Sequence, residues 1–157
     1  MNESSGPSFS EFNRQTVVGL IGIGVIGALL IYGLSMLLSS FIIGPALCRS
    51  ASESVCSQST TYSYHIAAII TGIIAVVGLV KLFVYRPLFV ALALLIGSWP
   101  LYDTFLPSLS WPWALASLLF INIIGYVTFS WLLRSYTFLL SLVFTVVVTI
   151  ALFVVSR

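Results

Sequence analysis

The sequence predicts an all-α, polytopic integral membrane protein with about five transmembrane helices and a cytoplasmic N-terminus. Of its 157 residues, 60% are hydrophobic and only 6% are charged, whereas about a quarter of the residues of a soluble domain are charged. The apolar residues form runs of membrane length, which Pro, Gly, Ser and Arg separate. Because lipid cannot hydrogen-bond to the backbone, and because these runs do not alternate in polarity as barrel strands do, we expect helices.

Five apolar runs define the expected organisation. Residues 1–15 are polar and form the expected cytoplasmic tail, and residues 16–157 form a single transmembrane domain. An outer loop rich in Ser and Thr is expected at 46–65, and Arg86-Pro87 closes the second span because proline cannot donate the next backbone hydrogen bond. The spans are expected at 16–43, 66–84, 88–106, 113–133 and 136–156.

The third run leaves a rival topology open. Trp99-Pro100 interrupts this run, and if residues 88–106 dip into the membrane and return, four spans remain and both termini are cytoplasmic. The positive-inside rule gives four Lys or Arg residues inside and two outside in both topologies, so charge does not decide between them. Aromatic rings prefer the headgroup level, which favours five spans. That topology places four rings near the outer surface: Trp99, Tyr102, Trp111 and Trp113.

The two cysteines of the chain, Cys48 and Cys56, both lie in the expected outer loop. The outer side of a bacterial membrane is oxidising, and a separation of seven residues differs from the C-x-x-C spacing of thiol-exchange proteins. We therefore expect a structural disulfide, which the chain-entropy model values at about 2.5 kcal/mol for so short a loop. Even with the nearby His65, this loop lacks the four ligands of a structural zinc site, and no metal is expected.

Residues 22–27 match G-x-G-x-x-G, the dinucleotide-binding fingerprint. That fingerprint follows a strand, opens a helix and has an acidic residue about 20 residues later. Here the glycines lie inside an apolar run, and the first acidic residue downstream is Glu53 in the outer loop. We therefore expect neither a nucleotide nor any other cofactor.

The small residues of the first span predict helix packing. Gly and Ala let two helix backbones approach closely in a membrane, and Gly24-x-x-x-Ala28 is a pair of this kind. The second span carries two matching pairs, Ala68-x-x-x-Gly72 and Thr71-x-x-x-Ala75, so we expect the first two spans to pack together. The alternative is that this flank of the first span binds a second protein. The expected helix-packing residues are Gly19, Gly22, Gly24, Gly27 and Ala28.

A few polar side chains lie at membrane depth, where each needs a partner or water. Asp103 is expected near the outer edge of the third span, capping a turn or hydrated, and Lys81 is expected to reach the cytoplasmic interface. Asn122 is expected to hydrogen-bond to another helix from the middle of the fourth span. His65 is expected at the outer interface. Asp103 and Asn122 are the candidates for an intramembrane polar site.

These features favour a non-enzymatic accessory or structural protein of a bacterial cytoplasmic membrane, which packs against a larger membrane protein or a second copy of itself. The sequence has no nucleophile–base pair, paired carboxylates or metal-ligand spacing, so we expect no enzyme activity. A net charge of +2 without a basic patch argues against nucleic acid as a partner. The alternative is a small oligomeric transporter or channel that uses Asp103 and Asn122.

Overall fold

The computed structural model describes residues 14–43, 45, 58–84, 86–133 and 147. Helices dominate these residues, and no strand occurs among them, which confirms the all-helical prediction for this part of the chain. The elements in chain order are α1 (Arg14–Leu37), the π-helical segment η1 (Leu38–Ile43), α4 (Ser59–Lys81), α5 (Pro87–Thr104), the 3-10 turn η2 (Leu106–Ser108) and α6 (Trp111–Leu132).

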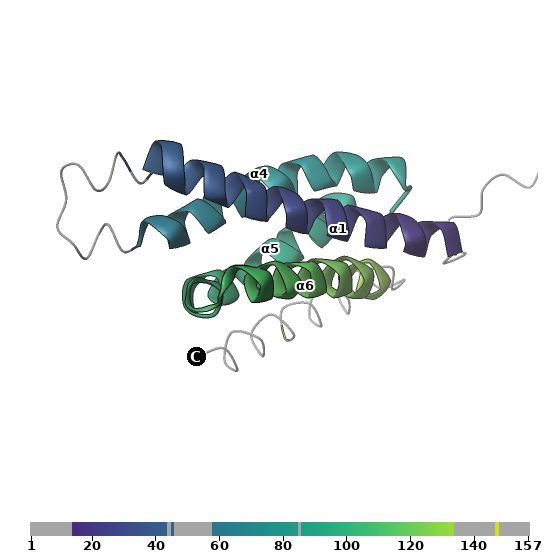
Figure 1. Cartoon of the computed structure of the whole chain (residues 1–157). Helices are drawn as coiled ribbons and strands as arrows, with labels where there is room; N and C mark the ends of the chain where they lie inside the picture. Colours follow the sequence, from purple (N-terminus) through teal and green to yellow (C-terminus); the bar gives the residue numbers. More distant parts are fainter. Residues whose placement is uncertain (1–13, 44, 46–57, 85, 134–146, 148–157) are drawn as a thin grey trace, which may run out of the picture.

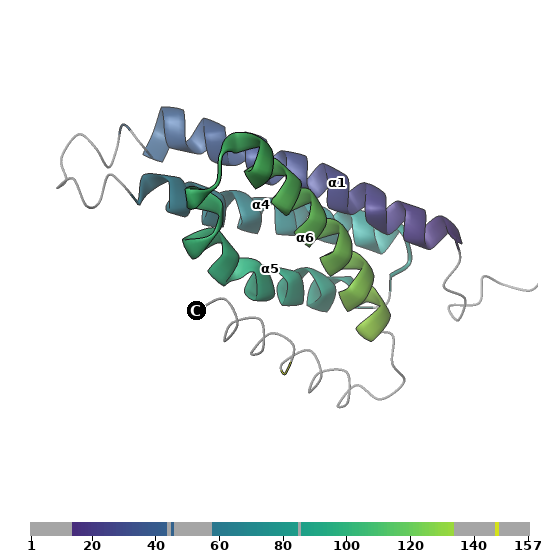
Figure 2. The ribbon, with the colours of Figure 1, turned by 60° about the horizontal axis from the view of Figure 1, so that its bottom comes forward.

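The four long helices alternate in direction and form a ring of neighbours (Figure 1). α4 packs between α1 and α5, and α6 closes the ring by packing against α5 and α1. Figure 2 shows α6 crossing the other helices diagonally. At one end of the bundle, the start of α1, the end of α4 and the start of α5 lie together (Figure 1). This end, the basic end, carries Arg14, Lys81 and Arg86. The opposite, aromatic end is formed by the start of α4, the end of α5 and the start of α6, and it carries Tyr62, Tyr64, Trp99, Tyr102, Trp111 and Trp113.

Three of the described helical segments are long and apolar enough to cross a membrane: the continuous α1–η1 segment, α4 and α6. α5 is apolar but shorter. Large apolar side chains are exposed on the outside of the bundle, as lipid contact requires, and Ile26, Ile73 and Phe120 are examples. The chain is therefore a membrane protein by the length and composition of its helices. The fifth predicted span, 136–156, lies outside the described residues except for Val147.

The start of α4 differs from the sequence prediction. The expected loop extends to residue 65, but α4 begins at Ser59. The polar residues of this first turn are compatible with a helix because hydroxyls can bond to their own backbone. The Ser63 hydroxyl donates to the Ser59 carbonyl at 2.7 Å. Residues 59–65, which their polarity assigns to the loop, therefore form the first two turns of α4.

The predicted interruption at Pro100 is also corrected. Proline lacks the N–H that would bond to the carbonyl four residues earlier, but α5 continues through it to Thr104. The following turn still closes, since the Phe105 N–H donates to the Leu101 carbonyl at 3.2 Å. α5 thus runs in one direction from the basic end to the aromatic end and does not turn back as a re-entrant segment would (Figure 1).

The interior of the bundle has two apolar clusters, one towards each end. The cluster near the basic end includes Leu20, Leu79, Val90, Tyr126 and Phe129. The cluster near the aromatic end includes Ala28, Ile31, Tyr64, Tyr102, Leu106 and Leu118. Because lipid is as apolar as these side chains, close van der Waals packing rather than expulsion of water holds the helices together.

The short connection between α4 and α5 fixes how these two helices face each other. Phe83 and Arg86 adopt left-handed backbone angles, with φ of 53° and 56°, a conformation that costs about 1–2 kcal/mol for a residue with a side chain. This connection folds α5 back along α4. A residue some distance before the connection therefore meets one the same distance after it.

Candidate functional site

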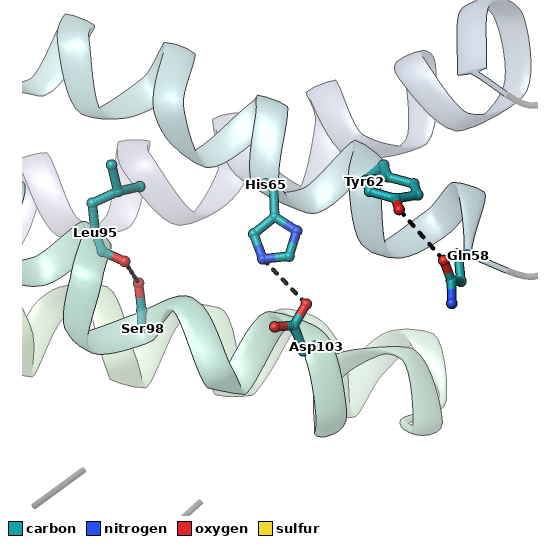
Figure 3. Close-up of polar contacts among 6 residues, drawn as sticks. All are labelled: Gln58, Tyr62, His65, Leu95, Ser98 and Asp103. Atoms are coloured by element: carbon teal, nitrogen blue, oxygen red, sulfur yellow. Dashed lines mark hydrogen bonds and ion pairs between the residues drawn. The ribbon is translucent and has the colours of Figure 1, made fainter. Parts of the chain in front are cut away.

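The described part of the chain has one pairing of opposite ionisable groups, between α4 and α5 at the aromatic end. His65 lies sixteen residues before the end of α4, and Asp103 lies sixteen residues after the start of α5. At about 1.5 Å per residue, both lie about 24 Å from the connection. The His65 Nε2 and Asp103 Oδ1 atoms are 3.3 Å apart (Figure 3).

The two partners differ in their access to solvent or headgroups. The His65 side chain is 11% exposed, whereas the Asp103 side chain is 45% exposed. His65 Nε2 has the separation of an ion pair but makes no hydrogen bond to a described residue. The contact is thus an electrostatic one whose strength depends on a proton on the imidazole, because the pair carries opposite charges only when His65 is protonated.

Aromatic rings enclose the imidazole. Trp99 and Asp103 are four residues apart on α5, so their side chains lie on the same face of the helix. The Trp99 ring lies over the His65 ring, with centroids 4.1 Å apart and planes tilted by 32°. Tyr102 meets the imidazole edge-on, with centroids 6.0 Å apart and planes at 81°. An indole face attracts a cation, so both the carboxylate and the indole interact more strongly with a protonated imidazole than with a neutral one.

Two serine hydroxyls near this site donate to carbonyls of their own helices. The Ser98 hydroxyl donates to the Leu94 carbonyl at 2.7 Å, and the Ser35 hydroxyl donates to the Tyr32 carbonyl at 2.8 Å. Such local bonds satisfy the hydroxyls without a ligand. The ionisable chemistry of the aromatic end therefore belongs to His65 and Asp103.

Asn122 lies on α6 in the interior of the bundle, away from this pair. Its side-chain amide donates to the Leu118 carbonyl of the same helix at 2.9 Å. This corrects the expectation that the amide bonds to another helix. Its Oδ1 atom faces Gly27 of α1, 3.5 Å from where a β-carbon on that glycine would lie. The structure thus gives Asp103 and Asn122 different partners and does not bring them into one site.

Thr71 of α4 lies beside the same glycine. Its γ-methyl would be 3.7 Å from a β-carbon on Gly27, and its hydroxyl is buried without a hydrogen bond to a described residue. Thr71-x-x-x-Ala75 is one of the two pairs of small residues that the sequence predicts to pack against the first span, and Thr71 does lie against α1. Its small size at the junction of α1, α4 and α6 is the signal that marks it as a contact residue.

The predicted helix-packing residues divide into two groups. A β-carbon on Gly24 would lie 2.8 Å from the Ile123 Cα atom of α6, so these two backbones are in close contact. Ala28 is fully buried, and a β-carbon on Gly19 would meet the Leu82 side chain. Gly22, in contrast, has no described atom within 4 Å of such a β-carbon. The flank therefore packs against α6 as well as α4, and Gly22 is outside this contact.

The remaining predicted residues lie at the basic end or outside the described part. Lys81 is exposed at the last turn of α4, where the sequence places it at the interface. Cys48 and Cys56, the predicted disulfide, lie outside the described residues. Within the described ranges, no three His, Cys, Asp or Glu side chains come together as metal ligands would.

The chain matches no protein-family model, and its comparison with curated proteins and with solved structures gives no significant similarity.

Proposed function

We propose that this chain is a non-enzymatic accessory protein of a bacterial cytoplasmic membrane, and that it packs against a transmembrane helix of a larger membrane protein. In this proposal the outward face of α1 makes the contact. The bundle has five spans, the fifth being residues 136–156, and the basic end faces the cytoplasm, in keeping with the positive-inside rule.

The observation that carries the proposal is a pair of open glycines on α1. Gly22 and Gly33 both have no described atom within 4 Å of an added β-carbon. They are eleven residues apart, which is three turns of a helix, so they lie on one face. Large apolar side chains on that face are exposed, among them Val18, Ile26, Leu29 and Met36.

Open glycines in a membrane helix are well suited to receive another helix. With no side chain, glycine lets a partner backbone approach until van der Waals packing drives association. α1 already uses this type of contact inside the bundle, where Gly24 lies against the backbone of Ile123. The outward glycines offer the same geometry to a partner. The exposed apolar residues around them suit a partner helix from the lipid phase.

Purification of the full chain from its native host in a mild detergent tests the proposal. We expect a larger membrane protein to copurify in fixed ratio, and we expect Gly22→Leu to reduce its recovery at least tenfold, because the side chain blocks close approach. Gly72→Leu is the matched control, since Gly72 of α4 does not pack against the first span as the sequence predicts, and a β-carbon added to it would meet no described atom within 4 Å. A homogeneous homo-oligomer without a partner, or equal recovery with both variants, would contradict the proposal.

A small oligomeric transporter or channel is the second candidate, and the His65–Asp103 pair favours it. Proton-coupled transport needs an ionisable group with a partner at membrane depth, and Asp103 has such a partner in His65. In this alternative Asp103 exchanges a proton and Asn122 contacts the substrate from a separate position. Loss of flux in reconstituted vesicles on Asp103→Asn, without loss of folding, would support it over the accessory role.

A further inference from the structure

We propose that His65 and Asp103 form a proton-responsive clasp between α4 and α5, which is closed when His65 carries its second proton. The clasp is a feature of the aromatic end and is independent of the partner that α1 binds. With the orientation proposed above, the clasp responds to the pH outside the membrane.

The position of the pair within the fold supports the clasp. α4 and α5 are joined directly at the basic end by residues 82–86, so their separation there is set by the chain. At the aromatic end no such connection exists between them. His65 and Asp103 therefore act at the end of this helix pair where a non-covalent contact has the greatest effect on their separation.

The chemistry around the imidazole also supports the clasp. Two groups on α5 interact more favourably with the protonated form: the Asp103 carboxylate, 3.3 Å from Nε2, and the Trp99 ring, whose centroid is 4.1 Å from that of the imidazole. A neutral imidazole offers the carboxylate a dipole, whereas an imidazolium offers it a full opposite charge. Protonation thus tightens both contacts at once, and both join α4 to α5.

Among the described residues, no competing charge is observed near His65. The other titratable groups around His65 and its neighbour Tyr64 are phenols: Tyr102 of α5, Tyr64 itself, and Tyr32 of α1. Phenols are uncharged at neutral pH. η1, which also packs against α4, has no titratable side chain, and Arg14 of α1 lies at the basic end. In the described structure, Asp103 is thus the charged partner that faces His65.

The pair also has access to water. A clasp must exchange its proton with water, and a fully enclosed imidazole does so slowly. Asp103 is 45% exposed, so its carboxylate can pass a proton between water and the enclosed ring. The pair thus combines an enclosed imidazole, which takes up the proton, with an exposed carboxylate.

The test uses the full chain in lipid nanodiscs, with histidine labelled by ¹⁵N in its ring. The chain contains one histidine, so every ring signal reports His65. We record the signals between pH 5 and 8, where neutral and protonated imidazoles can be distinguished. We expect the pH dependence of these signals to differ between the parent protein and Asp103→Asn, because the opposite charge is gone. Asp103→Glu keeps the carboxylate and should restore most of the parent behaviour.

A second measurement distinguishes a clasp from an isolated titration. Trp111, Trp113 and Trp131 are exposed, so replacing all three with Phe leaves Trp99 as the sole indole. A protonated imidazole in contact with an indole quenches its fluorescence, and we expect Trp99 emission to fall as the pH falls, over the same range in which the NMR signals change. His65→Gln should abolish this change.

Three results would overturn the clasp. The first is an identical pH dependence of the His65 ring signals in the parent protein and in Asp103→Asn. The second is a histidine that stays in one protonation state from pH 5 to 8. The third is a Trp99 emission that is insensitive to pH or that keeps its pH dependence in His65→Gln.

Discussion

The inward and outward faces of α1 carry the same residue type with different surroundings. On the inward face, a β-carbon on Gly24 would come within 2.8 Å of the α6 backbone, and one on Gly27 would lie 3.5 Å from the Asn122 side chain. On the outward face, Gly22 and Gly33 have no described neighbour within 4 Å. The comparison teaches that a glycine-rich membrane helix can hold its own bundle together and still present an open glycine face.

The largest effect that would sharpen this comparison is expected from Gly24→Ala. The added methyl would overlap the Ile123 backbone, which cannot move aside without shifting α6. Overpacking of this kind costs about 1–3 kcal/mol, and we expect a loss of about 2 kcal/mol in the free energy of unfolding. An SDS titration in mixed micelles, followed by tryptophan fluorescence, measures it. A loss below about 0.5 kcal/mol would mean that α1 and α6 are not in backbone contact.

A smaller loss is expected from Gly125→Ala on α6. Here the added methyl would meet the end of the Leu94 side chain of α5 rather than a backbone, and a side chain can turn about 30° away from its rotamer at a cost of about 0.5–1.5 kcal/mol. We expect a loss of about 1 kcal/mol in the same titration. A loss in the free energy of unfolding larger than that of Gly24→Ala would show that Leu94 cannot move. A side-chain neighbour would then resist an added methyl as strongly as a backbone neighbour does.

The smallest effect is expected from Gly22→Ala on the outward face. A methyl at this open position meets no described atom, and substitutions at such positions usually change stability by less than about 0.5 kcal/mol. The isolated chain should therefore unfold at the same SDS concentration as its parent. A loss as large as that of Gly24→Ala would break the comparison, because both faces would then be packed.

The helical class and most of the described helix positions could be predicted from the sequence, because apolar runs of membrane length leave few alternatives. The boundary at Ser59 could not be predicted from polarity, because the Ser63 hydroxyl satisfies itself within the helix. The continuation of α5 past Pro100 depends on tertiary packing, which a rule about proline does not contain.

The pairing of His65 with Asp103 was missed for a different reason. Both residues are predicted at the outer side of the membrane, but no contact between them is predicted. Their equal distances from the connection at Arg86-Pro87 were the available signal, since two antiparallel helices bring such residues to one depth. The rotation of each helix, which turns both side chains towards each other, is set by packing and could not be derived from spacing.

The unequal lengths of the described helices have a consequence for the surrounding bilayer. The continuous α1–η1 segment has 30 residues and α5 has 18, which correspond to about 45 Å and 27 Å of helix. A hydrocarbon layer about 30 Å thick cannot match both lengths. A helix longer than the layer tilts or projects from it, whereas at a shorter one the lipid thins or flanking side chains reach to the interface. The two lengths thus favour a thinner lipid annulus beside α5 than beside α1.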